Sequence, residues 1–116
     1  MSDPDGRTPA RLVLTTAPDR ETAARIARSL VERSLAACAN LLPGARSVYR
    51  WQGRIEEQDE VLLVLKTTTA RLAELERAID ELHPYDVPEF VVLEPARVEA
   101  RYLAWLVAET GEKPRG

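Results

Sequence analysis

The sequence has one cysteine, one histidine and few aromatic residues, and each scarcity excludes a class of protein. The single cysteine, Cys38, cannot form a disulfide within the chain and fits a reducing cytoplasm. The single histidine, His83, cannot supply the several imidazoles that many zinc and copper sites take. Apolar runs such as residues 61–65 are far too short to span a bilayer. Residues 1–10 lack the apolar core of a signal peptide, so we expect a cytoplasmic protein without a membrane anchor.

The overall composition is that of an ordinary globular domain. The 116 residues suit one hydrophobic core, and 45% of them are hydrophobic while 30% are charged. The net charge of −3 argues against electrostatic binding to nucleic acid or anionic lipid. We expect a polar tail at residues 1–10, a single domain at 11–110 and a second tail at 111–116.

Hydrophobic patterning predicts strands and helices in alternation. Branched apolar runs bounded by turn residues indicate strands, and apolar residues at helical spacing indicate helices. The expected order is a strand at 11–17, a helix at 20–33, strands at 36–51 and 54–67, a helix ending at 83, a strand at 89–95 and a helix at 98–111. This is the order of an α+β, ferredoxin-like fold with a split β-α-β pattern, a long central hairpin and an extra C-terminal helix.

Local signals place several boundaries. Asp19 is suited to cap the first helix, and Thr68 or Thr69 to cap the second. The Pro43-Gly44 pair predicts a bulge in the long hairpin, and Gln52-Gly53 predicts its two-residue turn. Pro84 should end the second helix at His83, and Gly111 stands where a C-terminal cap is expected after the third.

One face of the predicted sheet is left partly uncovered, because too few residues remain to cover it. The helices cover one face, while Cys38, Val48 and residues 62–65 indicate that the other face is at least partly apolar. We expect copies of the chain to associate through this face or through the hairpin edge, which would bury the exposed apolar surface. Two aromatic residues lie near the hairpin turn, Tyr49 and Trp51. They either pack at the edge of the chain's own core or reach into a neighbouring subunit.

The stretch "LHPYDVPEF", residues 82–90, is the clearest candidate site. His83 in the last helical turn suits a capping role, because a positive charge is favoured there. The alternative is a metal ligand, with Asp86 or Glu89 adding oxygen and Cys38 adding sulfur if the fold brings it close. The acidic run 56–60 indicates a solvated strand rim more than a cation site, since the calcium-loop pattern is missing.

Catalytic motifs are missing from the sequence. Ser29, Ser34 and Ser47 stand outside any G-x-S-x-G turn, and neither a Walker loop nor a dinucleotide-binding glycine motif is present. Cys38, flanked by alanines, has the pattern of a small packed residue and not of a nucleophile. We therefore predict a protein that is not an enzyme and requires no cofactor.

Several stretches taken together resemble the CutA family of divalent-cation tolerance proteins. They are "TTAPD" at 15–19, "LAACANLLPGARSVYRWQG" at 35–53, "EVLLVLKTT" at 60–68, "LHPYDVPEFVVL" at 82–93 and "YLAWL" at 102–106. The resemblance implies a ferredoxin-like homotrimer in which Tyr49 and Trp51 reach across to a neighbour. It also implies a role in tolerance of copper and other divalent metals.

The metal site implied by the resemblance is only partly present in this sequence. Some bacterial members have a cysteine where this chain has Thr15, and a histidine pair where it has Leu82-His83. His83 and Glu89 therefore remain as candidate ligands for Cu(II) or another divalent cation, and weak binding is expected. Cys38, Lys66, Tyr85 and Asp86 are candidate residues of an intersubunit cleft. The alternative implied function is a trimeric PII-like module that senses a small ligand in that cleft, without a metal role.

Overall fold

A computed structural model describes residues 7–111 of the chain. Its elements, in order, are β1 (Ala10–Ala17), α1 (Arg20–Glu32), β2 (Cys38–Trp51), β3 (Arg54–Thr68), a 3-10 turn (Thr69–Arg71), α2 (Leu72–Leu82), β4 (Val91–Leu93) and α3 (Ala100–Glu109). The expected tails fall partly outside the described residues, although Ala10 of the first is already in β1. The order confirms the predicted alternation of strands and helices.

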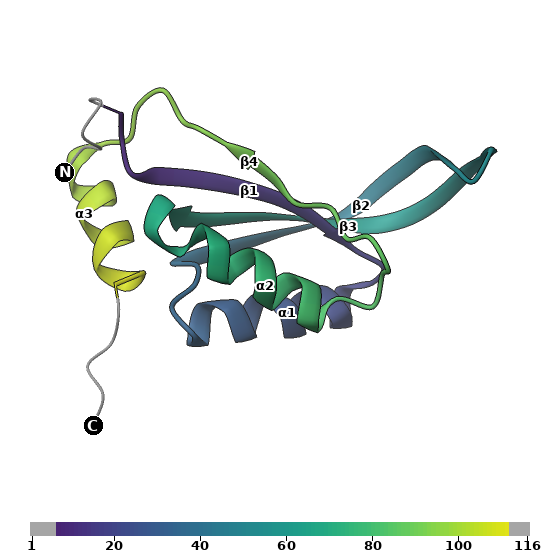
Figure 1. The fold of residues 1–116 in the computed structure, drawn as a ribbon, viewed down its shortest axis with the longest axis horizontal. Helices are drawn as coiled ribbons and strands as arrows, with labels where there is room; N and C mark the ends of the chain where they lie inside the picture. Colours follow the sequence, from purple (N-terminus) through teal and green to yellow (C-terminus); the bar gives the residue numbers. More distant parts are fainter. Residues whose placement is uncertain (1–6, 112–116) are drawn as a thin grey trace.

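The strands form one antiparallel sheet in the order β2-β3-β1-β4. Helices α1 and α2 lie side by side against one face of the sheet, and α3 packs at the end where β1 begins (Figure 1). This confirms the α+β, ferredoxin-like fold with an additional C-terminal helix.

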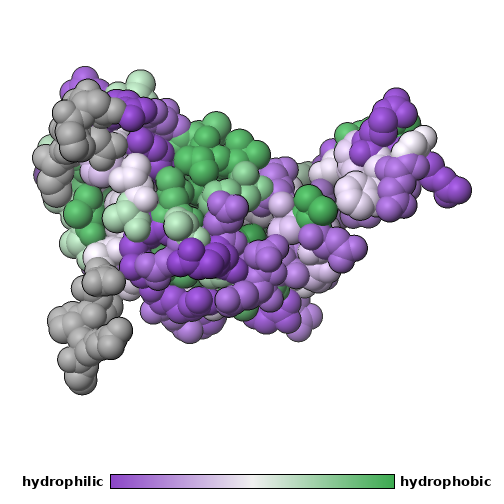
Figure 2. Space-filling model, in the orientation of Figure 1, coloured by the Kyte–Doolittle hydropathy of each residue, from purple (hydrophilic) through white to green (hydrophobic). Residues whose placement is uncertain are grey.

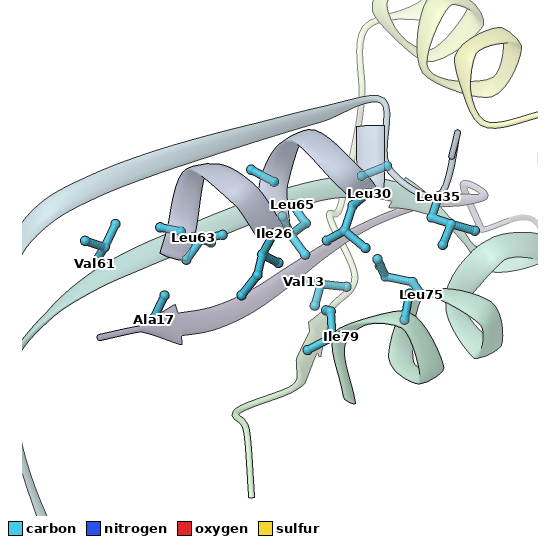
Figure 3. Close-up of a cluster of buried hydrophobic side chains, with 14 residues drawn as sticks. Val13, Ala17, Ile26, Leu30, Leu35, Val61, Leu63, Leu65, Leu75 and Ile79 are labelled. Atoms are coloured by element: carbon cyan, nitrogen blue, oxygen red, sulfur yellow. The ribbon is translucent and has the colours of Figure 1, made fainter. Parts of the chain in front are cut away.

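The core lies between the sheet and the helix pair. Every second residue of β1 and β3 faces the helices, and Figure 3 shows Ile26 and Leu30 of α1 meeting Leu75 and Ile79 of α2 over these strands. The largest fully buried side chains of the cluster are Val13, Ile26, Leu30, Leu63, Leu65, Leu75 and Ile79. The rigid central strands formed in this way fix the positions of the residues on the opposite face.

The β2–β3 hairpin extends well beyond the body of the molecule (Figure 1). Its pairing shifts register between Leu42 and Ala45, at the predicted Pro43-Gly44 bulge, where Gly44 has a φ of 88°. Gln52 and Gly53 both have positive φ, at 50° and 79°, as a tight hairpin turn requires. Both predictions are confirmed, and the tip carries Trp51 with 44% of its surface exposed.

Three predicted boundaries are wrong. Neither Thr68 nor Thr69 caps α2, because the Thr68 hydroxyl pairs with that of Thr110 at 3.3 Å and a 3-10 turn intervenes before Leu72. The last strand is shorter than predicted, because only Val91–Leu93 pairs with β1. The C-cap of α3 is Thr110, whose hydroxyl donates to the Leu106 carbonyl at 2.8 Å, so Gly111 follows the cap.

The sheet face opposite α1 and α2 is apolar and only partly covered. Leu12, Leu14, Leu62 and Val64 share this face, because they alternate with the residues that point into the core. Helix α3 covers one end, where the Lys66 Nζ lies 5.7 Å from the centre of the Tyr102 ring. Figure 2 shows hydrophobic surface gathered over the β4 region, where the exposed Val91 and Leu93 pair with Leu14 and Leu12 of this face. The predicted apolar second face is therefore present.

A buried threonine on β1 provides a test of this packing. Thr15 points into the core with 1% of its surface exposed, and its hydroxyl oxygen lacks a hydrogen-bond partner among residues 7–111. Because an unpaired buried hydroxyl is costly, we expect Thr15→Val to raise the free energy of unfolding by about 1 kcal/mol. Urea unfolding at fixed protein concentration measures this change.

The matched control is Thr67→Val on the neighbouring strand. Thr67 is equally buried, but its hydroxyl donates to the Leu35 carbonyl at 2.7 Å. Its loss should lower the free energy of unfolding by about 1 kcal/mol. Equal effects of the two substitutions would contradict the difference in hydrogen bonding.

Candidate functional site

The connector between α2 and β4 begins at a sharp helix end. The backbone N–H of His83 donates to the Ile79 carbonyl at 2.9 Å, and the residue then turns to an extended conformation with φ −85° and ψ 137°. Pro84 disfavours a helical His83 and cannot continue the helix, which confirms the predicted stop. The turn directs the His83 side chain toward β1, and only 8% of the residue is exposed.

Both ring nitrogens of His83 are engaged within the chain. The Nε2 atom lies 2.6 Å from the carbonyl oxygen of Thr16, and Nδ1 accepts the backbone N–H of Tyr85 at 3.1 Å. A carbonyl can only accept, so Nε2 carries the proton and Nδ1 keeps the lone pair. His83 is the C-cap residue of α2, as predicted, and its ring ties the connector to β1. A metal could reach Nδ1 only by displacing the Tyr85 N–H.

Tyr85 continues this network toward the hairpin. Its hydroxyl donates to the Glu60 Oε2 at 2.7 Å, and its ring lies 4.5 Å from that of His83, centre to centre. Burial raises the pKa of Tyr85 well above its usual value, and the hydrogen bond to the Glu60 carboxylate raises it further. Glu60 itself is only 8% exposed. A buried carboxylate is thus held in place by a neutral donor.

The raised pKa of Tyr85 gives a stability prediction. Between pH 10 and the higher folded-state pKa, the unfolded chain releases the phenol proton while the folded protein keeps it. The free energy of unfolding should therefore fall as pH rises above about 10. Tyr85→Phe should flatten this decline and cost about 1 kcal/mol at neutral pH, through the lost hydrogen bond. Urea unfolding at several pH values checks both; an unchanged alkaline slope in the variant would contradict the assignment.

A hollow of about 550 Å³ lies between the hairpin and the connector. We call it the hairpin hollow. It is lined by Thr16 of β1, by Ser47, Val48, Tyr49, Trp51, Gln58 and Glu60 of the hairpin, and by Tyr85, Asp86, Val87, Pro88 and Glu89 of the connector. The structure thus brings together candidate residues from two distant parts of the sequence.

Two candidate cleft residues do not belong to this hollow. Cys38 and Lys66 pair with each other at the opposite end of β2 and β3, and Lys66 lies beside α3. Conversely, the sequence interpretation missed Glu60, which it assigned to a solvated acidic rim. The signal was available: Glu60 has the same strand parity as Leu62 and Val64, so its side chain lies on the same face of the sheet as these apolar residues.

One chain does not present an assembled metal site. Within residues 7–111, no group of three or more His, Cys, Asp or Glu side chains is placed to hold one ion. Glu89 and Asp86 line the hollow, whereas His83 is not one of its described lining residues and has both ring nitrogens engaged. Any ion that binds here needs donors from a second chain or from water.

None of the helices in the described part of the chain is long and apolar enough to cross a membrane.

Comparison with known proteins gives a consistent result. Residues 11–109 match the family model described as CutA1 divalent ion tolerance protein. A Thermus thermophilus protein named divalent-cation tolerance protein CutA is 49% identical over 100 residues, which cover 86% of this chain and 97% of that protein.

Solved structures agree with the sequence comparison. The Cut A1 divalent cation tolerance protein of Thermus thermophilus superimposes with a TM-score of 0.86 at 48% identity, covering 88% of this chain and 99% of that one. A protein of Archaeoglobus fulgidus, titled periplasmic divalent cation tolerance protein CutA, gives 0.85 at 31% identity, covering 88% and 99%.

Proposed function

The chain belongs to the CutA1 divalent ion tolerance protein family, and from this premise we propose that it acts in the tolerance of divalent metal ions and not as an enzyme. The observation that carries the proposal is the match across residues 11–109, which spans the sheet, all three helices and the hairpin hollow. The engaged ring of His83 supports the non-catalytic part of the proposal. His83 is the one histidine, and it is held in the fold by two hydrogen bonds instead of facing a nucleophile.

The working form in this proposal is a homotrimer. Two features support association of copies: the open apolar face of the sheet, and the hairpin with its exposed Tyr49 and Trp51. A two-stranded ribbon is marginally stable alone, so the extended hairpin gains from packing against a neighbour. The proposed number of chains in the assembly, three, is taken from the family resemblance.

Weak binding of Cu(II) or another divalent cation is the second part of the proposal. His83 Nδ1 would supply nitrogen and Glu89 would supply oxygen, with further donors from a second copy. Binding must first break the 3.1 Å hydrogen bond from the Tyr85 N–H and expose a residue that is 8% accessible. This cost lowers the affinity for the metal ion. Weak binding is also expected because this chain has Thr15 where some bacterial members have a cysteine.

The lining of the hollow disfavours the alternative of a PII-like sensor for an anionic ligand. Lys66, its basic candidate residue, lies away from the hollow, and the charged residues that line it are Glu60, Asp86 and Glu89. A cytoplasmic location remains part of our proposal and is supported by the single cysteine. Cell fractionation with an antibody to the chain checks it.

Growth under metal stress tests the proposed function. The chain is expressed in a bacterial strain that lacks its own CutA relative and is sensitive to copper. We expect the wild-type chain to restore growth at raised copper, and His83→Gln to restore less at equal protein level. Full sensitivity despite abundant folded protein would contradict a role in metal tolerance.

A further inference from the structure

The tip of the β2–β3 hairpin carries two arginines without an ionic partner in their own chain. Lower in the hairpin, Arg46 pairs with Asp59 at 2.9 Å and with Glu57 at 3.4 Å. Arg50 and Arg54 are exposed, and within residues 7–111 no carboxylate lies within ion-pair distance of either. The tip extends beyond the body of the molecule, so this positive charge is available to a second chain (Figure 1).

The two arginines lie on opposite faces of the hairpin. Arg54 pairs directly with Trp51 across the turn, so these two side chains share one face. Tyr49 lies on that face as well, because alternate residues of a strand point the same way, and both rings line the hairpin hollow. Arg50 pairs with Ile55 on the other face. Arg54 is therefore the arginine that accompanies the aromatic face of the tip.

The rim of the hairpin hollow offers the opposite charge. Asp86 is exposed, and it lines both this hollow and a second one beside α2, which places it on the rim between the two. Within residues 7–111 it makes no hydrogen bond or ion pair. Glu60 already accepts the hydroxyl of Tyr85, and Glu89 is the proposed oxygen ligand of the metal ion. Asp86 is thus the carboxylate left for a positive group at the rim.

A contact between a hairpin tip and a hollow suits a ring of copies. The two surfaces differ and each chain has one of each, so the contact is heterologous and a closed ring leaves none of them unused. Such a ring fills every hollow instead of leaving it open. It also supports the extended hairpin, which is marginally stable as a two-stranded ribbon alone.

We propose that in the homotrimer the aromatic face of one hairpin tip packs over the hairpin hollow of the next chain, with the Arg54 guanidinium against the carboxylate of Asp86 of the partner subunit. The rings supply the apolar contact, and the ion pair at the rim fixes the register and the choice of partner. The inference rests on the proposed homotrimer and adds the residues that select the neighbour. It uses neither His83 nor Glu89.

A charge swap in the full chain tests the proposal, with sedimentation velocity over a dilution series as the readout. Arg54→Glu and Asp86→Arg each place like charges at every contact. A loss of about threefold per contact becomes about 30-fold in the association constant of a ring with three contacts. The variant with both substitutions restores opposite charges, so its association should return to within about threefold of the wild type. Higher salt should narrow the difference between the single variants and the wild type.

Arg50 provides the matched control. Arg50→Glu makes the same change of charge at the same tip but on the opposite face, so it should associate as the wild type does. Combined with Asp86→Arg, it should remain as weak as Asp86→Arg alone, although the net charge equals that of the swapped variant. Circular dichroism confirms that each variant is folded.

Three results would overturn the proposal: wild-type association of Arg54→Glu, no restoration in the swapped variant, or equal weakening by Arg50→Glu. A wild-type monomer would contradict the proposed homotrimer together with this inference. A wild-type trimer without coupling between Arg54 and Asp86 would overturn this inference alone. Growth of the wild-type chain under copper stress tests the proposed function separately.

Discussion

Replacing Trp51 with alanine should shift the assembled protein toward dissociated chains. Trp51 lies at the tip of the extended hairpin with 44% of its surface exposed, and Val48 and Ile55 are exposed on the other face of the same ribbon. The part of the Trp51 surface that its own chain leaves exposed is available to pack against a neighbour. Truncation of an aromatic interface anchor costs about 2 kcal/mol or more, which is about 30-fold in an association constant.

Sedimentation velocity over a dilution series measures this effect. The matched control is Val31→Ala on α1, which also removes an exposed apolar side chain but from the helix layer. We expect the control to sediment as the wild type does at every concentration. Equal association of Trp51→Ala and wild type on dilution would contradict the role of the hairpin in assembly.

His83→Ala should lower the free energy of unfolding by about 2–4 kcal/mol even without metal. The substitution removes the 2.6 Å bond to the Thr16 carbonyl and the acceptor of the Tyr85 N–H. It also leaves a cavity at a site that is 8% exposed. Because the histidine joins the connector to β1, its loss should loosen the wall of the hairpin hollow formed by residues 85–89.

Urea unfolding in the presence of a chelator measures this cost. His83→Gln is the informative companion variant, because its side-chain amide still offers one donor and one acceptor. We expect it to recover part of the stability. Full stability of His83→Ala in chelator would mean that the residue serves metal alone and that its hydrogen bonds contribute little to folding.

Features encoded by neighbouring residues could be predicted from the sequence. The helix end at Pro84, the bulge at Pro43-Gly44 and the turn at Gln52-Gly53 each depend on the backbone limits of proline or glycine. The order of strands and helices along the chain followed from the hydrophobic patterning. Such signals need no knowledge of distant contacts, and the structure confirms them.

Features that depend on distant partners could not be predicted. The Thr68 hydroxyl pairs with Thr110, which lies 42 residues away, and a capping rule based on local sequence cannot anticipate this. His83 was correctly placed at a helix end, but its partner Thr16 is 67 residues away. Lys66 lies six positions from Glu60 along β3, a span of about 20 Å, so it does not line the hairpin hollow. Its place in an intersubunit cleft stays a prediction.

Native mass spectrometry of the purified chain, titrated with Cu(II), is the sharpest test of a homotrimer that binds divalent metal through His83. We predict a trimer that takes up the metal weakly, and a His83→Gln trimer of the same mass that takes up clearly less. The glutamine variant is preferred here because it is the more stable of the two His83 variants in our account. A monomer at micromolar concentration, or equal copper uptake by the two trimers, would contradict the proposal of a homotrimer that binds divalent metal through His83.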